Sequence, residues 1–426
     1  MNYKRLINVT VLATFVFLNT TFAQNNITSP YSFIGLGDNY KKGNIRALSM
    51  GGTDMALRSN MYINMVNPAG ISGIDSLSFV GSVGVAMNNT SYRTSDLSSK
   101  FSSASINHLA IAFPITKWWK TSIKLLPYST IGYQVFDYSE VENGGHIQYE
   151  YNGSGGMDAI SWTNAISITK NLAFGIDASY YFGKVEHNRS VYFPDSVYVF
   201  NSLVREKVVI NGFFFEAGLQ YFQPLDEKNT LGFGITYGNE SKLNGATDYF
   251  ALTFLGDDIY NNSTVDTIRK WEEEEGSVRL PYSIGAGISW VKKDKLTLAA
   301  DFRFENWKDF EYLENRLDLS NKISASVGAE FIPESNTLSA YWKMVHYRVG
   351  FRYEHLGIKF ADNEIKEYAI SAGFGLPLRK SKTFVNLGFE LGQNGTIQND
   401  LIQERFFRVM LGISIKETWF RKSKYL

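Results

Sequence analysis

Apolar and polar residues alternate along most of this chain, from Leu77 to Ile415. In the stretch 172–182 every even-numbered residue is apolar, whereas Gly175, Asp177 and Ser179 occupy the other parity. Because successive side chains of a strand point to opposite faces, this pattern predicts strands with one apolar face. About fourteen such runs can be followed, and an even number is what bacterial single-chain membrane barrels have.

The composition helps to decide what covers the apolar faces. Aromatic residues make up 15% of the chain, and Gly is abundant with 36 residues. Beyond the N-terminal region, no stretch is apolar for long enough to predict a transmembrane helix. These features predict an all-β protein, a transmembrane antiparallel β-barrel in the outer membrane of a Gram-negative bacterium. A soluble β-sandwich is the alternative, but its outer faces should carry charge.

The spacing of the strands gives a second argument for a barrel. Short polar connections fall at 114–119, 169–171, 223–229, 292–295 and 377–382, and longer loops are predicted at 88–100, 186–202 and 239–276. Membrane barrels have short periplasmic turns and longer external loops. The alternation therefore places both ends of the mature chain in the periplasm. The turn at 333–343 is longer than this rule predicts.

The N-terminus has the features of a secretory signal peptide. Lys4 and Arg5 precede an apolar run at 6–18, and a small residue, Ala23, stands at the expected cleavage site. We therefore expect residues 1–23 to be a signal peptide, 24–74 an N-terminal plug, or hatch, inside the barrel lumen, and 75–426 the transmembrane β-barrel.

Charge and composition exclude several classes of function. Without Lys4 and Arg5 the 42 basic residues fall to 40 against 42 acidic ones, a net charge of −2, which suggests no nucleic-acid partner. There is no Cys and no motif for a phosphate loop, a metal site or a serine nucleophile, and the five His residues are scattered. We expect no catalytic residues, no metal and no cofactor. An outer-membrane lipid hydrolase, with Ser and His in reach of each other, stays open as an alternative.

The segment before the first strand contains a corner, Asn67-Pro68-Ala69-Gly70. Pro68 fixes its own backbone and cannot donate to a strand, and the small residues Ala69 and Gly70 allow a close approach to a wall. An ordinary turn is the simpler interpretation. Because the corner stands directly before the first strand, we interpret it as a fixed part of the plug.

Charged residues occupy the parity that would face the lumen. The twelve predicted inward charges comprise seven acids and five bases, which indicates mutual neutralisation rather than a single-sign ion filter. The densest groups are Asp301, Arg303 and Glu305 on one strand, and Arg348, Arg352 and Glu354 on another. We interpret these six residues as a lumen charge network that pairs internally and with the plug, with direct contact to substrate as the alternative.

At the level of motifs, the chain resembles the FadL-like family of outer-membrane transporters for long-chain fatty acids and other hydrophobic compounds. Residues 35–37, the stretch 46–52 with Gly51 and Gly52, and the corner 67–70 are similar to that family's hatch. Residues 280–285 and 304–307 resemble its central strand pair. The resemblance implies a plugged barrel of fourteen strands, in which a kinked third strand opens a sideways exit for the ligand.

Pro127 stands in the third predicted strand, between Leu126 and Tyr128. Proline removes a backbone donor from the ladder, so a gap is expected there on physical grounds as well. We predict a lateral opening at these three residues.

The sequence thus predicts a monomeric protein that passes hydrophobic small molecules such as long-chain fatty acids into the bilayer. The acidic run 272–275 argues against a carboxylate substrate, because like charges repel. Some relatives of the FadL-like family serve protein secretion, so an outer-membrane partner or shuttle protein of a secretion system is the second hypothesis.

Overall fold

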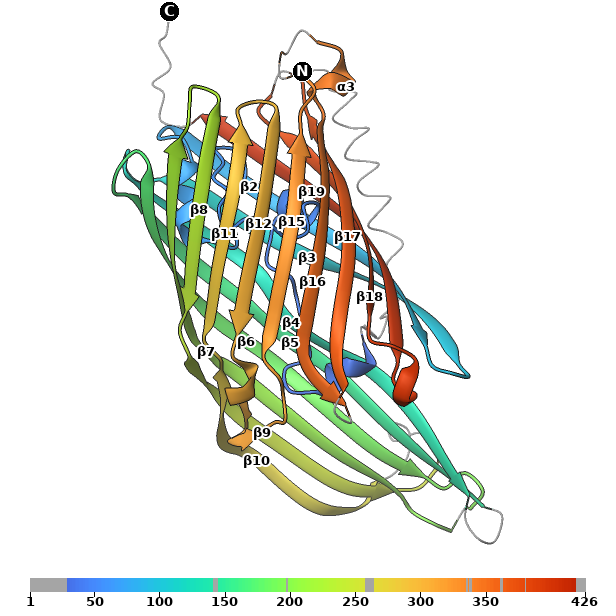
Figure 1. Cartoon of the computed structure of the whole chain (residues 1–426). Coiled ribbons are helices and arrows are strands. Elements are labelled where there is room, and N and C mark those ends of the chain that lie inside the picture. Colours follow the sequence, from blue (N-terminus) through green and yellow to red (C-terminus); the bar gives the residue numbers. More distant parts are fainter. Residues whose placement is uncertain are drawn as a thin grey trace, which may run out of the picture.

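The computed structural model of the chain is a closed antiparallel β-barrel with fourteen strand positions in its wall (Figure 1). It describes residues 29–140, 145–196, 198–256, 264–334, 336, 339–360, 363–379 and 381–418. The predicted signal peptide, residues 1–23, lies outside the described residues, as do residues 24–28 of the predicted plug. The fold class and the strand number predicted from the alternation are confirmed.

Sixteen elements make up the wall, and two pairs of them share a position. In chain order they are β2 (Ser78–Arg93), β3 (Ser98–Pro114), β4 (Trp119–Glu140), β5 (His146–Ser167), β6 (Leu172–Tyr192), β7 (Asn201–Pro224), β8 (Asn229–Gly238), β9 (Ser241–Phe254), β10 (Thr264–Leu280), β11 (Ser283–Lys292), β12 (Leu296–Glu305), β15 (Lys322–Phe331), β16 (His346–Phe360), β17 (Asn363–Pro377), β18 (Phe384–Asn394) and β19 (Gln403–Thr418). Both β8 and β9 pair with β7, and they pair in turn with β11 and β10, so β8–β9 and β10–β11 each take one position.

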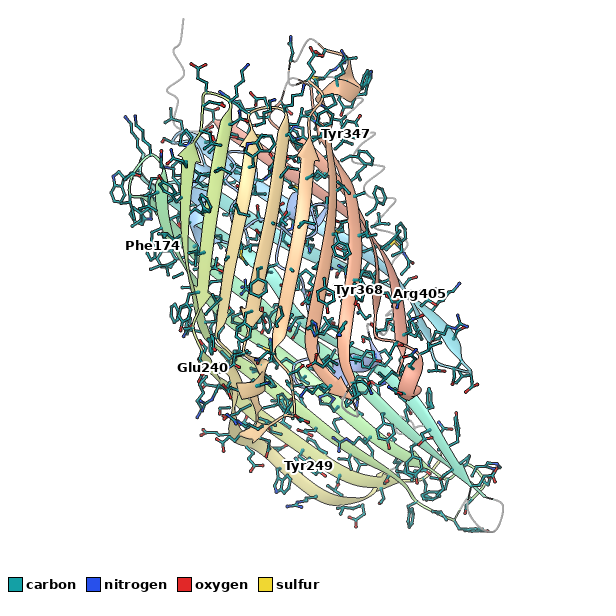
Figure 2. The ribbon with its side chains drawn as sticks, viewed as in Figure 1. Phe174, Glu240, Tyr249, Tyr347, Tyr368 and Arg405 are labelled. Atoms are coloured by element: carbon teal, nitrogen blue, oxygen red, sulfur yellow. The ribbon has the colours of Figure 1, made fainter. Side chains whose placement is uncertain are left out.

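The outer face of the wall is apolar. Large aliphatic and aromatic side chains such as Phe213 and Ile235 are 60% and 55% exposed there, and Tyr368 points outward in the same way (Figure 2). A soluble sandwich would lose stability with such a surface in water, whereas hydrocarbon accommodates it. Most wall strands pair with a neighbour on both edges, as a bilayer requires, and the exceptions in the described residues are part of the β3–β4 seam and one edge of β10.

The wall is much taller on one side than on the other. Strands β4 to β7 have 21 to 24 residues, whereas β8, β11, β12 and β15 have 10 each. The long strands project away from the end where the short turns lie (Figure 1). The prediction of a long loop at 239–276 is wrong, because most of that stretch forms β9 and β10 in this projection. We call the two ends of the barrel the short-turn end and the long-strand end.

Residues 29–74 precede the wall and are mostly buried. They contain η1 (Pro30–Phe33), β1 (Asp38–Asn39), α2 (Ile45–Leu48) and η2 (Pro68–Gly73). We call residues 29–74 the N-terminal segment. Its side chains and backbone bond to strands on opposite sides of the barrel, including β4, β7, β12, β15 and β17. The segment therefore lies within the ring of strands (Figure 1).

The remaining elements lie in the connections. η3 (Trp307–Asp309), β13 (Glu311–Tyr312) and β14 (Asn315–Arg316) connect β12 to β15, α3 (Tyr341–Met344) lies before β16, and η4 (Gln398–Asp400) lies before β19. None of the helices in the described part of the chain is long and apolar enough to cross a membrane. The turn predicted at 333–343 is long because it carries the first residues of α3.

Candidate ligand cavity and lateral gap

The seam between β3 and β4 is paired over only part of its length. Pairing runs from Pro114↔Lys120 to Leu109↔Leu125 and then stops. Beyond that point β3 continues to pair with β2, and β4 with β5. We call the unpaired part of this seam, bounded by residues 98–108 and 126–140, the lateral gap. Leu126, Pro127 and Tyr128, the residues predicted to border an opening, are the first residues of β4 past the last pair.

Pro127 lies two residues past the last pair of the seam. Its ring nitrogen has no hydrogen to donate to a strand ladder, although Pro127 stays opposite Asp158 in the pairing with β5. A β-bulge follows on the other edge, where the register with β5 shifts between Pro127 and Ser129. The bulge bends the strand locally and lets it diverge from β3.

The N-terminal segment bonds to the edge of β4 that β3 leaves free. Strand β1 pairs with Ser129 and Thr130. Next to it the N–H of Tyr40 donates to the carbonyl of Tyr128 at 2.8 Å, and the N–H of Ser29 donates to the carbonyl of Gly132 at 3.2 Å. Backbone groups away from water need such partners. The segment thus supplies hydrogen bonds that a neighbouring wall strand would otherwise make.

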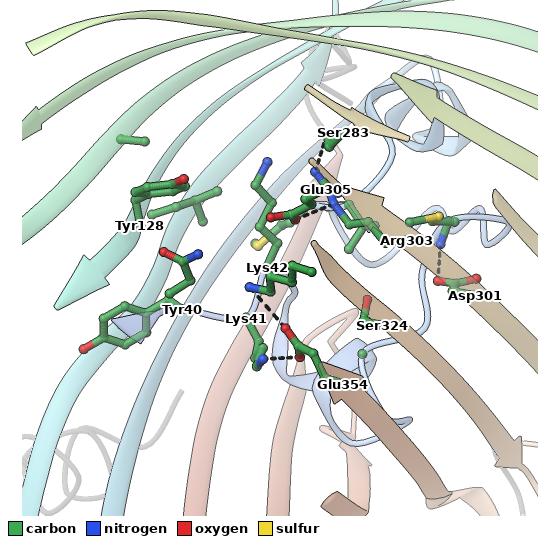
Figure 3. A pocket seen from close by; sticks show the side chains of 18 of the residues that line it. Tyr40, Lys41, Lys42, Tyr128, Ser283, Asp301, Arg303, Glu305, Ser324 and Glu354 are labelled. Carbon is green, nitrogen blue, oxygen red and sulfur yellow. Dashed lines mark hydrogen bonds and ion pairs between the residues drawn. The ribbon is translucent and has the colours of Figure 1, made fainter. Parts of the chain in front are cut away.

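A cavity of about 150 Å³ lies beside these residues. Leu126, Pro127 and Tyr128 line it on the side of the lateral gap, and Gly51 and Gly52 line it from the N-terminal segment. Of the predicted charge network, Asp301, Arg303, Glu305, Arg352 and Glu354 also line this first cavity, but Arg348 does not. Figure 3 shows Tyr128 and Asp301 on opposite sides of it. The structure thus brings together predicted residues that lie more than 200 positions apart in the sequence.

A second cavity of about 160 Å³ lies on the other side of β1. Asp38, Asn39 and Lys41 line it from the N-terminal segment, and Asn107 and Thr130 line it from the two strands that flank the lateral gap. Asn39 and Lys41 also line the first cavity. The stretch that contains β1 therefore separates two cavities, both of which reach residues at the gap.

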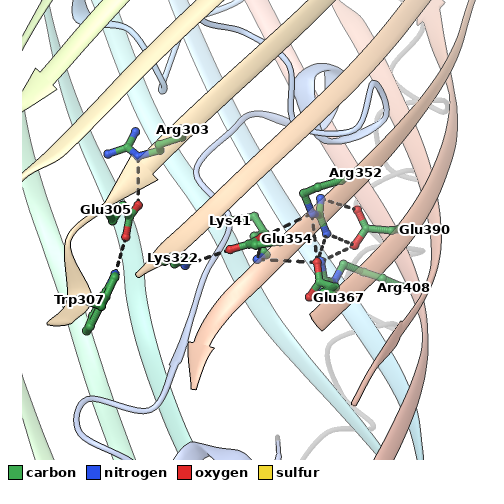
Figure 4. A network of polar contacts seen from close by, with 10 residues as sticks. All are labelled: Lys41, Arg303, Glu305, Trp307, Lys322, Arg352, Glu354, Glu367, Glu390 and Arg408. Carbon is green, nitrogen blue, oxygen red and sulfur yellow. Dashed lines mark hydrogen bonds and ion pairs between the residues drawn. The ribbon is translucent and has the colours of Figure 1, made fainter. Parts of the chain in front are cut away.

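Ion pairs extend across the lumen between the wall and the N-terminal segment (Figure 4). The guanidinium of Arg352 lies 2.7 Å from Glu367 and 3.2 Å from Glu390. Lys41 of the segment and Lys322 of β15 both pair with Glu354. Such pairs satisfy charges that would be costly to bury alone.

Arg348 belongs to a separate group nearer the short-turn end. Glu330 accepts two hydrogen bonds from Arg46 of the N-terminal segment, at 3.1 and 2.9 Å, and one from Arg348 at 2.7 Å. Arg348 also donates to Tyr62 of the segment at 3.0 Å. All of these side chains are buried. This cluster fixes the middle of the segment to β15 and β16.

The corner Asn67-Pro68-Ala69-Gly70 forms the start of η2, and Asn67 caps it by accepting from the N–H of Ala69 at 3.0 Å. The amide of Asn67 also donates to the carbonyls of Met55 and Leu219, at 2.9 and 3.2 Å. The corner therefore packs inside the barrel against β5, β6 and β7 rather than standing at the lateral gap. The missing side chain of Gly70 faces Asn64 of the same segment, whereas the backbone of Pro68 and Ala69 lies against Gly175 of the wall.

The close approach between segment and wall depends instead on glycines of the wall. A Cβ added at Gly175 of β6 would lie 2.5 Å from Pro68, and one at Gly218 of β7 would lie 2.1 Å from Asn67. On the opposite side, a Cβ at Gly350 of β16 would lie 2.1 Å from the backbone nitrogen of Gly51. We call the inward-facing wall glycines at this level the glycine girdle: Gly175, Gly218, Gly234, Gly287, Gly328 and Gly350. The sequence analysis noted the abundance of glycine but not this role.

Within the described residues no group of three or more Asp, Glu or His side chains is arranged to hold a metal. One Ser and one His do touch, since Ser82 lies 2.8 Å from His108, whose other ring nitrogen lies 2.7 Å from Asn107. This is the order of a nucleophile, a base and an orienting amide. Ser82 is only 6% exposed, however, and lines neither cavity. His146 does not belong to this buried group. It lies at the long-strand end, where a hydrogen bond to Asp195 raises its pKa.

Comparisons with known proteins agree with this architecture. A family model described as BamG matches residues 4–426. Among solved structures, the toluene transporter TbuX of Ralstonia pickettii has a TM-score of 0.58 and 13% identity, covering 88% of this chain and 99% of that one. The toluene transporter TodX of Pseudomonas putida has a TM-score of 0.57 and 13% identity, covering 90% and 100%. A FadL homologue of Pseudomonas aeruginosa has a TM-score of 0.56 and 12% identity, covering 90% of this chain and 100% of that one.

At these identities the solved structures establish the fold alone, a barrel of the FadL type. The suspected resemblance to that family's barrels is thereby confirmed. No curated protein matches the sequence.

Proposed function

The chain belongs to the BamG family, and from this premise and its FadL-type barrel we propose that it carries hydrophobic small molecules across the outer membrane. It acts as a transport protein and not as an enzyme. The N-terminal segment serves as the plug, and the first cavity receives the ligand. Long-chain fatty acids are one class of such ligands, and the solved structures with this fold include transporters of toluene.

The observation that carries the proposal is the contact between the first cavity and the lateral gap. The same three residues, Leu126, Pro127 and Tyr128, line the cavity and begin the unpaired part of the β3–β4 seam. A hydrophobic molecule gains about 25 cal/mol for each Å² of apolar surface that leaves water. Movement sideways into lipid is therefore downhill, whereas release into the periplasm is not. We propose that the ligand leaves through the gap.

Filling the first cavity tests this proposal. Ser324 of β15 lines it, and the next residue, Ala325, is exposed on the outer face of the same strand. In Gram-negative cells with matched surface abundance of each variant, Ser324→Trp should reduce uptake of the fluorescent probe N-phenyl-1-naphthylamine to the level of cells without the protein. Ala325→Trp should leave uptake unchanged. Equal uptake by the two variants would contradict transport through this cavity.

The second hypothesis, a partner of a protein-secretion system, is supported by the edge of β10. Within the described residues, Thr264 to Ser277 pair with β9 on one side only, since β13 covers just Val278 and Arg279 on the other. An unpaired strand edge can accept a strand from another protein. Recovery of a secretion-channel protein in equal amount, when the tagged chain is purified at native expression, would favour this hypothesis over transport.

A further inference from the structure

Basic side chains lie close together on the outer face of the barrel at the long-strand end. Arg405 of β19 is opposite Ser91 of β2, and Ser91 is opposite Lys100 of β3. Residues that are opposite each other point to the same face of a sheet, and neighbouring strands are about 4.8 Å apart, so the backbones of Lys100 and Arg405 are about 10 Å apart. Arg93 follows two residues after Ser91 on β2, nearer the end of the strand.

The same row continues on the other side of Arg405. Arg405 is opposite Gln393 of β18, and Gln393 is opposite Tyr368 of β17. Lys366 stands two residues before Tyr368, closer to the long-strand end. Tyr368 is 49% exposed, and both it and Arg405 project from the outer face (Figure 2). We call the four basic residues of this face the basic rim: Arg93, Lys100, Lys366 and Arg405.

The basic rim carries positive charge that the protein does not neutralise. All four side chains are exposed, and within the described residues none of them forms an ion pair. Arg405 donates from its Nε to the Oε1 of Gln393 at 3.2 Å, so the terminal nitrogens of its guanidinium can bind another acceptor. The exposed acid Glu364, on the same strand as Lys366, pairs instead with His355 at 3.1 Å.

Another exposed arginine at the long-strand end is neutralised. Arg279 of β10 lies 3.0 Å from Glu240 and 3.0 Å from Glu311. Its guanidinium therefore already has two carboxylate partners, whereas that of Arg405 has only a neutral amide. The two arginines are equally accessible in kind but differ in the charge that they leave for a partner.

The basic rim stands directly beside the apolar belt of the wall. In the next outward row toward the short-turn end, Phe407, Leu391 and Ile370 are opposite one another on β19, β18 and β17. They are 39%, 61% and 62% exposed. The change from apolar to basic thus takes place within two residues, or about 7 Å along a strand. Short turns of membrane barrels are periplasmic, so this boundary is the one in the outer leaflet.

We propose that the basic rim binds the phosphorylated head group of a glycolipid in the outer leaflet, with the acyl chains along the apolar belt beneath it. Guanidinium and ammonium groups form charge-assisted hydrogen bonds to phosphate, and basic clusters at a membrane surface attract anionic head groups. Ser91 and Gln393, between the basic residues, can bond to sugar hydroxyls. The lipid lies over the β19–β2 seam and reaches the lateral gap, which Lys100 borders. This lipid site does not depend on the proposed transport function.

Lipid A, the phosphorylated glycolipid anchor of lipopolysaccharide, is the probe that tests the inference. The purified full chain in an uncharged detergent is titrated with lipid A and with the same lipid after removal of its phosphates, and native mass spectrometry counts the bound molecules. Phosphorylated lipid A should bind about ten-fold more tightly, because hydrogen bonds to charged groups contribute at least that much. Equal affinity for the two lipids would overturn the inference. Displacement of lipid A by an equal concentration of inorganic phosphate would also overturn it, since the site would then bind free phosphate.

Variants locate the site. Arg405→Gln and Lys100→Gln should each weaken binding of phosphorylated lipid A about ten-fold and leave the phosphate-free lipid unchanged. Both side chains are exposed, so the gel mobility of the folded barrel should stay as it is. Arg279→Gln is the matched control, because its guanidinium is already paired, and it should not change the affinity. Unchanged affinity in both rim variants, or an equal loss in Arg279→Gln, would refute the assignment to the basic rim.

Discussion

The N-terminal segment is held differently on the two sides of the barrel. On the side of β15 and β16, Arg46 is fixed to Glu330 by two hydrogen bonds in a buried cluster that includes Arg348. On the side of β4, the contact is made by the two-residue strand β1, a few further backbone hydrogen bonds, and Leu36, which lies in one apolar cluster with Ile131 of β4. One side depends on buried charge, the other on a short ladder and apolar packing.

This difference indicates which side can open. Removing one member of a buried ion cluster leaves an uncompensated charge and costs about 3–5 kcal/mol. A backbone hydrogen bond that can be exchanged for water contributes only about 1 kcal/mol. We therefore expect the segment to stay attached to β15 and β16 while β1 separates from β4. The movable contact lies at the lateral gap, between the two cavities.

The largest effect on uptake is expected from a covalent bond that joins β1 to β4. Asp38 and Thr130 are opposite each other in the pairing, at a separation that suits a disulfide, and the chain has no other Cys. In the Asp38→Cys, Thr130→Cys variant, oxidation should abolish uptake of N-phenyl-1-naphthylamine by cells, and a reductant should restore it.

The control for the lock is a disulfide in a seam that is already fully paired. Val83 of β2 and Ile413 of β19 are opposite each other there. Val83→Cys with Ile413→Cys should leave uptake unchanged in both redox states. Uptake that persists in the oxidised β1–β4 variant would show that this contact does not open during transport.

Removing the charge that anchors the other side should have the next largest effect. Glu330→Gln leaves Arg46 and Arg348 without their shared carboxylate, so we expect the free energy of unfolding to fall by about 3 kcal/mol. Glu334→Gln, at an exposed pair with Lys343, should change it by less than about 1 kcal/mol. Urea titration in lipid vesicles, followed by the gel mobility of the folded barrel, measures both. Equal stability of the two variants would contradict the anchoring role.

The fit of the segment against the wall gives a smaller effect. Gly350→Ala places a Cβ 2.1 Å from the backbone nitrogen of Gly51 and should lower the free energy of unfolding by about 2 kcal/mol, the usual cost of overpacking. At Gly81 the nearest atom to an added Cβ is 3.5 Å away, in the Phe79 ring, so Gly81→Ala should be nearly neutral. The same urea titration compares them. A neutral Gly350→Ala would mean that the segment can shift away from β16.

Pro127→Val should give the smallest of these effects. The substitution restores a backbone donor beside the lateral gap, and one additional ladder hydrogen bond of about 1 kcal/mol would slow uptake by about five-fold. Pro114→Val, at the paired end of β3, serves as the control and should leave uptake unchanged. Faster uptake in Pro127→Val than in the control would indicate that proline does not set the end of the seam.

The wall was predictable from sequence because alternation is a local signal that repeats in every membrane-spanning strand. Pro127 was also visible, since proline limits pairing wherever it stands in a strand. By contrast, the alternation does not predict β9 and β10, because they lie in the projecting sheet, where both faces meet water and runs such as Glu272 to Glu275 show no apolar parity.

The contacts within the site could not be derived from local pattern. Gly51 meets Gly350, and Arg46 meets Glu330, across some 300 residues of intervening chain. Parity shows that Asp301 and Arg303 face inward, but it does not show that Arg303 is neutralised while Asp301 is not. The sequence does not predict the glycine girdle for the same reason, because the role of a wall glycine depends on which residue lies opposite it in the folded barrel.

The glycine girdle also constrains the order of assembly. The segment lies so close to glycines on opposite sides of the wall that we expect it to be enclosed before the ring is complete. The seam that completes the ring joins the first wall strand to the last, β2 to β19, and those are the parts of the wall furthest apart along the chain. We therefore expect the N-terminal segment to be in position when β19 reaches β2, so that the barrel is wrapped around it during biogenesis.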